Sequence, residues 1–182
     1  MPIKSDAQVQ RTNKMIISAL LRLMDEYDFK EITITQIAQY AAIDRRTYYR
    51  HFESKEEIIA CYIKNIAKEY EEYLLNQHSF STKSIAISFF TVCLDHKADL
   101  LRLYKHKLLT LLLDEFDLLF LTYHNKFLHE VEDFEQYRDV EYVVPFFVGG
   151  FWYMLQKWVA DGMVKTPEQL ADIVLQFLPK HI

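Results

Sequence analysis

Arg45 and Arg46 lie at the start of a segment, residues 44–52 with the sequence DRRTYYRHF, that is crowded with cationic and aromatic side chains. A guanidinium can donate two parallel hydrogen bonds to the acceptors of a guanine or to one phosphate. Hydroxyl groups on neighbouring side chains can reach phosphate oxygens. The chemistry that this segment could perform is therefore recognition of a nucleic acid.

The residues on either side predict that this segment is the second helix of a helix-turn-helix. Thr33 and Gln36 form a capping box that begins a short first helix. Asp44 can accept a hydrogen bond from the backbone amide of Thr47, and so begins the next helix after a turn of about three residues, 41–43. The alternative to nucleic-acid recognition is that the arginines lie on a solvent-exposed helix face and pair with acidic neighbours.

The rest of the chain is also predicted to be helical. Half of its residues are apolar, and three glycines and four prolines are too few for many short strands. Apolar residues recur at helical spacing in a first helix at about 9–27 and in a long helix that begins near Ser54. Further helices are expected at about 82–96, 99–106, 107–131, 141–160 and 167–178. The predicted fold is all-α, with a three-helix helix-turn-helix module, a C-terminal helical bundle and about nine helices in total.

These patterns divide the chain into three parts. Residues 1–54 are expected to form the DNA-binding domain, in which residues 1–8 are a flexible arm. Residues 55–77 are expected to form a connecting helix, and residues 78–182 a C-terminal helical domain, to which the family resemblance given below assigns effector binding and dimerisation.

The charge distribution restricts any contact with DNA to a small area. The net charge is −5, but residues 1–57 carry nine basic and nine acidic side chains, so the excess of acid lies in the remainder. Arg45, Arg46, Arg50 and Lys55 form a local positive focus. A contact with DNA is expected at this focus and not over a broad basic surface.

Several other classes of protein are not indicated. The sequence shows no signal peptide and no apolar run of the roughly 20 residues that span a bilayer, so a cytoplasmic protein without membrane contact is expected. Cys61 and Cys93 are read as reduced, packed thiols. No glycine-rich phosphate loop, serine elbow or metal-ligand constellation is present. We therefore expect no catalytic residues, no metal and no cofactor, and no enzyme.

Three stretches together resemble the DNA-binding signature of TetR-type regulators: ITITQIA at 32–38, AAIDRRTYYRHF at 41–52 and SKEE at 54–57. The resemblance implies that Arg45 and Arg46 face bases and that Tyr48 and Phe52 belong to the core. It also implies that five side chains approach phosphates: Thr35, Thr47, Tyr49, His51 and Lys55. Arg50, which belongs to the local positive focus, is expected to contact DNA as well. Ala42 and Arg46 stand where the family usually has glycine, so the operator is not expected to follow that of relatives.

The C-terminal part resembles a TetR subgroup common in low-GC Gram-positive bacteria, through FFVGGF at 146–151 followed by Trp158, Gly162 and PEQL at 167–170. This resemblance implies a homodimer through the last two helices. Two adjacent glycines lower helix propensity and are better explained where helices approach closely, either in a dimer or at a crossing within one subunit. The expected dimer interface comprises Phe146, Gly149, Gly150, Tyr153, Trp158, Leu170, Val174 and Phe177.

An effector pocket is also implied, because in this family a small molecule usually lies among the middle helices. The candidate lining residues are Phe89, Phe90, Cys93, Phe116, Phe120, Tyr123 and Phe147. Aromatic side chains at helical spacing are also typical of an ordinary core, so this alternative stays open.

The expected function is that of a sequence-specific, DNA-binding transcriptional repressor. It would bind a near-palindromic operator as a homodimer, and a small molecule could release it. One alternative is an activator of the same family. The other is a helical scaffold that binds ligands or proteins without DNA.

Overall fold

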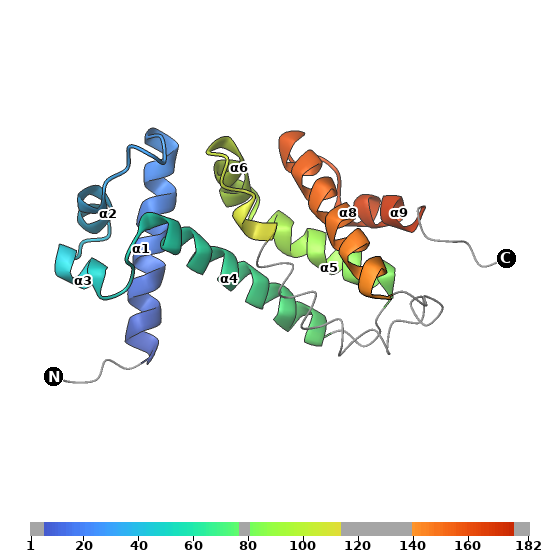
Figure 1. The fold of residues 1–182 in the computed structure, drawn as a ribbon, viewed down its shortest axis with the longest axis horizontal. Coiled ribbons are helices and arrows are strands. Elements are labelled where there is room, and N and C mark those ends of the chain that lie inside the picture. Colours follow the sequence, from blue (N-terminus) through green and yellow to red (C-terminus); the bar gives the residue numbers. More distant parts are fainter. Residues whose placement is uncertain (1–5, 77–80, 114–139, 177–182) are drawn as a thin grey trace. The chain divides into compact units, whose positions relative to one another are not determined.

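The structure is a computed structural model that describes residues 6–76, 81–113 and 140–176 (Figure 1). Within these ranges it contains eight helices with described bounds, the first residues of a further helix at 111–113, and no strand, so the prediction of an all-α fold is confirmed. The helices are α1 (Asp6–Glu26), α2 (Ile34–Tyr40), α3 (Arg45–Tyr49), α4 (Lys55–Leu75), α5 (Thr82–Asp95), α6 (Lys97–Lys105), α8 (Val140–Ala160) and α9 (Pro167–Leu175).

The chain divides into two compact units, residues 1–63 and 64–182, and α4 contributes to both. In the first unit, α1 buries an apolar face that includes Ile16, Leu20 and Met24. The helix begins at Asp6, so residues 6–8, which were expected to belong to a flexible arm, are helical. Asp6 lies in the first turn, where a carboxylate interacts favourably with the helix dipole.

The predicted caps of the helix-turn-helix are confirmed. Thr33 and Gln36 exchange both hydrogen bonds of a capping box, with the Thr33 amide donating to Gln36 Oε1 at 2.8 Å and the Gln36 amide donating to Thr33 Oγ1 at 3.2 Å. The Thr47 amide donates to Asp44 Oδ1 at 2.7 Å. These bonds satisfy amides at the helix starts that have no partner within the helix.

The turn between α2 and α3 places a residue with a side chain in the left-handed region. Ala42 has a φ of 53°, and the amide of the next residue, Ile43, donates to the carbonyl of Ala38 at 3.0 Å. This arrangement is a Schellman ending, in which glycine is the usual residue at the left-handed position. The Cβ of Ala42 therefore introduces strain at the tightest point of the motif.

The second unit is built around aromatic side chains from α5 and α8. Phe89 and Phe90 lie 5.1 Å apart at an angle of 78°, and Phe90 stacks on Phe151 at 5.8 Å. Trp158 lies edge-on to Phe90 at 5.6 Å, and its Nε1 donates to the carbonyl of Lys165 at 3.1 Å. All four aromatic rings are buried, so they form the core of this unit.

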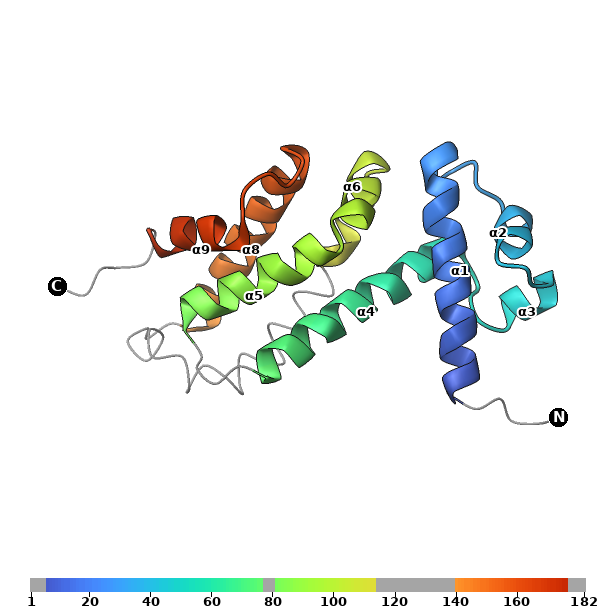
Figure 2. The ribbon, with the colours of Figure 1, turned by 180° about the vertical axis from the view of Figure 1, so that it is seen from behind.

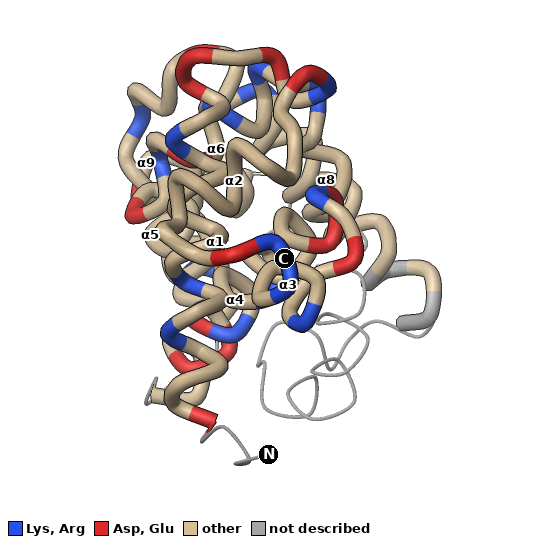
Figure 3. Tube along the Cα trace, turned by 90° about the vertical axis from the view of Figure 1, so that its left-hand side faces the viewer, with Lys and Arg blue, Asp and Glu red and all other residues tan. Residues whose placement is uncertain are grey.

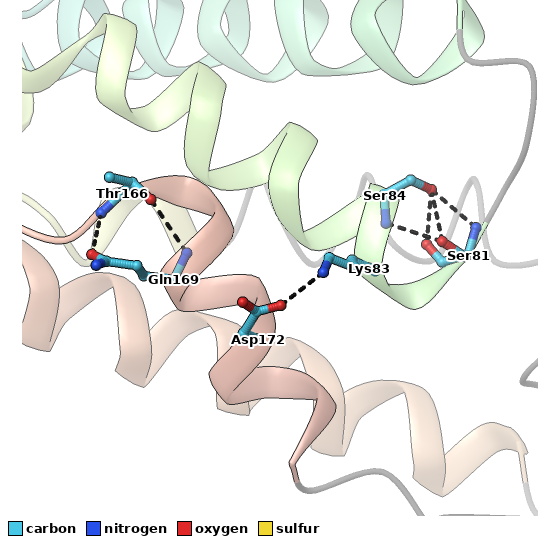
Figure 4. A network of polar contacts seen from close by, with 6 residues as sticks. All are labelled: Ser81, Lys83, Ser84, Thr166, Gln169 and Asp172. Atoms are coloured by element: carbon cyan, nitrogen blue, oxygen red, sulfur yellow. Dashed lines mark hydrogen bonds and ion pairs between the residues drawn. The ribbon is translucent and has the colours of Figure 1, made fainter.

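Helices α5 and α9 lie side by side in this unit (Figures 1 and 2). The Lys83 ammonium donates to the Asp172 carboxylate at 2.8 Å between them. Each helix also begins with a capping box, Ser81 with Ser84 and Thr166 with Gln169 (Figure 4).

One predicted helix begins in a different place. The helix expected from residue 107 starts later, because residues 107–110 form turns. Lys107 has a φ of 59°, and the amide of Leu108 donates to the carbonyl of Leu103 at 2.8 Å, which ends α6 in a second Schellman arrangement. Residues 114–131 of the expected helix lie outside the described residues.

Replacing Ala42 by glycine removes the Cβ that the left-handed conformation crowds. We expect the free energy of unfolding of Ala42→Gly, measured by urea denaturation, to rise by about 0.5–1 kcal/mol. Ala41→Gly is the matched control, because Ala41 has a right-handed backbone and is buried, and it should lose about 1 kcal/mol. Equal effects of the two substitutions would contradict the assignment of strain to Ala42.

Candidate nucleic-acid interface

The short helix α3 separates its exposed side chains from its buried one. Arg45, Arg46 and Tyr49 are exposed, with Tyr49 at 50%, whereas Tyr48 is fully buried. Burial raises the pKa of Tyr48 to about 12, and its hydroxyl has no hydrogen-bond partner among the described residues. Tyr48 therefore anchors the helix to the core, as expected, and the arginines face outwards.

Arg45 and Arg46 have no ion pair or hydrogen bond to another described side chain, so both guanidinium groups are available to a ligand. Figure 3 shows basic positions along α3 and along α1. In contrast, the alternative of arginines paired with Asp44 and Glu53 does not occur for Arg45 or Arg46 in this structure.

Thr47 and Arg50 take part in a network at the start of α3. The Thr47 hydroxyl donates to Asp44 Oδ2 at 3.0 Å and accepts from Arg50 Nη2 at 2.6 Å. The pKa of the Asp44 carboxyl is lowered by the hydrogen bonds from the backbone and side chain of Thr47 and, to a smaller degree, by the Arg50 guanidinium. Thr47 and Arg50 therefore stabilise the cap of α3. Some of their polar groups, which were expected to contact DNA, are used in these internal hydrogen bonds.

His51 connects the end of α3 to α1. Its Nδ1 lies 2.6 Å from Oδ1 of Asn13, and because an amide oxygen only accepts, Nδ1 carries the proton. Asn13 could not be found from the sequence, since it lies 38 positions from His51 and no helical periodicity relates the two residues. Thr35, the remaining expected contact, is exposed in the first turn of α2.

Lys55 differs from its expected role as a phosphate anchor. Its Nζ donates to three backbone carbonyls in the loop before α2, to Phe29 at 2.5 Å, Lys30 at 3.0 Å and Ile32 at 3.0 Å. It also lies 4.8 Å from the centre of the Phe29 ring, a cation–π contact. An ammonium has three N–H donors, so all of them are used within the protein. Lys55 therefore connects the start of α4 to this loop through hydrogen bonds and does not project freely toward a ligand.

The described members of the expected effector pocket lie in the aromatic core. Phe89, Phe90 and Cys93 are buried, Phe147 is half-buried, and burial raises the pKa of the Cys93 thiol. The other three, Phe116, Phe120 and Tyr123, lie outside the described residues. The pocket therefore stays a prediction.

The expected dimer residues fall into two groups. Phe146 and Tyr153 on α8 are each 73% exposed, and Gly150 between them is exposed as well. Trp158, Leu170 and Val174, at 3–6% exposure, are buried inside the second unit, which corrects their assignment to a surface. The reason is that α9 packs against α5 within one chain. Phe177 lies outside the described residues.

Gly149 and Gly150 have open space around them. Apart from the two chain neighbours and the nearby backbone of α8, no heavy atom of the described residues lies within 4 Å of a Cβ built on either glycine. The alternative of a crowded crossing within one subunit is therefore not observed in this part of the chain. Tyr142 was not among the expected dimer residues, but it is 72% exposed and lies one turn before Phe146 on the same face of α8.

No group of three histidine, cysteine or acidic side chains is arranged to hold a metal ion in the ranges given above. In the same ranges, no helix is both long enough and apolar enough to cross a membrane.

The chain matches the models of two protein families. Residues 16–60 match "Bacterial regulatory proteins, tetR family", and residues 81–180 match "Transcriptional regulator C-terminal region". Together they cover both units of the structure.

Two curated relatives are helix-turn-helix regulators. The uncharacterised HTH-type transcriptional regulator YxbF of Bacillus subtilis is 25% identical over 181 residues, which are 95% of this chain and 46% of the relative. The HTH-type transcriptional regulator HbdR of Aromatoleum sp. is 32% identical over 69 residues, which are 38% of this chain and 30% of the relative. The chain thus spans less than half the length of the curated relatives that it matches.

Three solved structures have a similar fold at low identity. The fatty acid degradation regulator FadR of Bacillus halodurans has a TM-score of 0.67 at 16% identity, with 97% of this chain and 96% of that chain covered. The dihydroxyacetone kinase operon activator DhaS has a TM-score of 0.63 at 16% identity, covering 92% and 93%. A TetR-like transcriptional regulator from Rhodococcus sp. RHA1 has a TM-score of 0.61 at 18% identity, covering 98% and 95%.

The three carbonyl contacts of Lys55 predict a loss of stability when its charge is removed. Lys55→Met leaves these carbonyls without their charged donor, so the free energy of unfolding should fall by about 1–3 kcal/mol in urea denaturation. Lys68→Met is the control on the same helix, because the side chain of Lys68 is 71% exposed and, among the described residues, forms a single ion pair, with Glu72 at 3.8 Å. If both variants unfold at the same urea concentration, the structural role of Lys55 is wrong.

Proposed function

The chain belongs to the TetR family of bacterial transcriptional regulators, and from this premise we propose that it binds an operator in duplex DNA through α3. The observation that carries the proposal is the pair Arg45 and Arg46, exposed at the start of α3 without partners among the described side chains. In a helix-turn-helix the N-terminal residues of the second helix contact base edges in the major groove. The chain would therefore act in the cytoplasm, where the chromosome is.

Arg45 and Arg46 are the proposed base readers, because each guanidinium can donate to two acceptors of a guanine. Thr35, Tyr49 and His51 are the proposed phosphate contacts, since they lie on or beside the same helix-turn-helix. Phosphate contacts fix the register of the protein on the duplex but carry no sequence information. Lys55 is left out of this set because its donors are used internally.

The second part of the proposal is a homodimer formed through α8. Tyr142, Phe146 and Tyr153 are spaced by four and seven residues, so they lie along one face of the helix, and each is more than 70% exposed. Gly149 and Gly150 lie in the same segment and would let a second helix approach closely. Exposed aromatic side chains in one stripe support burial against another chain.

A dimer with twofold symmetry presents two copies of α3 to the DNA. The operator should then be a near-palindrome whose half-sites are separated by one helical turn or a multiple of it. We propose that the protein is a repressor released by a small molecule held in the second unit. Activation is the alternative, because DhaS, a structural neighbour, is described as an operon activator.

Replacing Arg46 tests whether it reads bases. Fragments selected from genomic DNA by the purified protein provide the operator, and a random duplex of equal length provides the reference. Arg46→Ala should lose about 1–3 kcal/mol of discrimination, a fall of about 5- to 150-fold in the ratio of operator to random affinity. Arg22→Ala, an exposed arginine on α1, is the control and should leave that ratio unchanged. An equal loss on both duplexes for Arg46→Ala would show that the residue contacts phosphate only.

A charge in the aromatic stripe of α8 tests the dimer. Phe146→Asp should raise the dissociation constant of the dimer by about 30-fold or more, because a central aromatic contact of about 2 kcal/mol is lost and a carboxylate is placed in the interface. Sedimentation velocity measures the monomer fraction over a range of concentrations. Val164→Asp is the matched control, since Val164 is 81% exposed and lies outside α8. A dimer that persists in Phe146→Asp, with Val164→Asp indistinguishable from it, would exclude this face.

A further inference from the structure

The first unit has eight described basic residues, and its structure separates them by what they contact. Lys55 is bound to backbone carbonyls, and Arg50 donates to Thr47. Arg45 and Arg46 lie on α3 and are the proposed base readers. Among the described basic side chains of this unit, those left to bind phosphate beyond the recognition helix are the remaining four: Arg11, Lys14, Arg22 and Lys30.

Neighbouring acids distinguish these four residues. Arg22 is followed at three and four positions by Asp25 and Glu26, which share its side of α1. Lys30 lies between two acids as well, at positions 28 and 31. Arg11 and Lys14, however, have no Asp or Glu within four positions on either side along α1.

The position of Arg11 and Lys14 in the first unit is set by α1 and its contact with His51. The hydrogen bond of 2.6 Å between Asn13 and His51 places this part of α1 beside the end of α3 (Figures 1 and 3). Lys14 is adjacent to Asn13 in sequence, and Arg11 lies one turn before Lys14. Both are exposed, because the opposite face of α1 is buried in the core.

We propose that the N-terminal half of α1 is a second DNA-contacting surface, in which Arg11 and Lys14 bind the phosphates that flank each half-site. The inference rests on the proposed binding of DNA through α3 and extends that interface to a different helix. Its occupant is the DNA backbone, because two uncompensated cations beside α3 complement a row of phosphates. The Asn13–His51 hydrogen bond holds this surface at a fixed place relative to the recognition helix.

The salt dependence of binding provides the test. Each neutralised phosphate contributes about −0.9 to the slope of the logarithm of the association constant against the logarithm of the salt concentration. The double variant Arg11→Gln, Lys14→Gln should reduce the size of this slope by about two for each protomer bound. Affinity for operator and random duplex should fall together, because phosphates carry no sequence information. Glutamine keeps the helix propensity of α1, and circular dichroism verifies that the fold is retained.

The matched control is the double variant Arg22→Gln, Lys30→Gln. It removes the same charge from the same unit, so it accounts for a general effect of net charge on association. A slope that changes equally in both double variants, or in neither, would overturn the proposal for α1 while leaving binding through α3 intact. A wild-type protein that shows no salt-sensitive binding to any duplex would instead overturn the proposed function itself.

Discussion

The burial of Tyr48 is the interaction on which the candidate interface depends. Helix α3 has five residues, and an isolated helix of this length is not stable in water. Burial in the core must therefore hold it, and Tyr48 is the residue of α3 whose side chain is fully buried. Locally, its ring also lies edge-on to that of Tyr49 at 5.4 Å and tilted against that of Phe52 at 6.5 Å. With Tyr48 directed into the core, the side chains of Arg45 and Arg46 are directed outwards.

Polar contacts complete the positioning of α3 at each end. Asp44 caps its start through Thr47, and His51 joins its end to Asn13 on α1. Lys55 ties the beginning of α4 to the loop that precedes α2. The cations of this unit thus divide into those whose hydrogen bonds stabilise the fold and those that are left for a ligand.

The second unit shows the same division for aromatic side chains. Phe89, Phe90, Phe151 and Trp158 pack against one another in the core, whereas Phe146 and Tyr153 on α8 are exposed. One helix therefore contributes to both the interior of the unit and a solvent-facing stripe. A stripe of this kind is what a helical surface needs for association with a second copy of the chain.

The sequence by itself determined the features that depend on nearby residues. The caps at Thr33 and Asp44, the short turn between them and the inward position of Tyr48 follow from spacings of three to five residues, and the structure confirms them. The all-α fold follows from helical periodicity in the same way. The starts of α1 and of the helix after Lys107 were misplaced, because helix ends depend on single capping contacts that periodicity does not report.

Only the tertiary structure decided what distant residues do. Lys55 has the type and position of a phosphate ligand, yet its partners are carbonyls more than twenty residues away in the chain. Asn13 gains its importance from a histidine 38 residues later. Leu170 and Val174 form an apolar stripe that could face another subunit or the interior of its own subunit. The packing of α9 on α5 buries this stripe within its own subunit. The physical reason is that a sequence pattern specifies which face of a helix is apolar or charged, whereas the partner of that face is set by the packing of the whole unit.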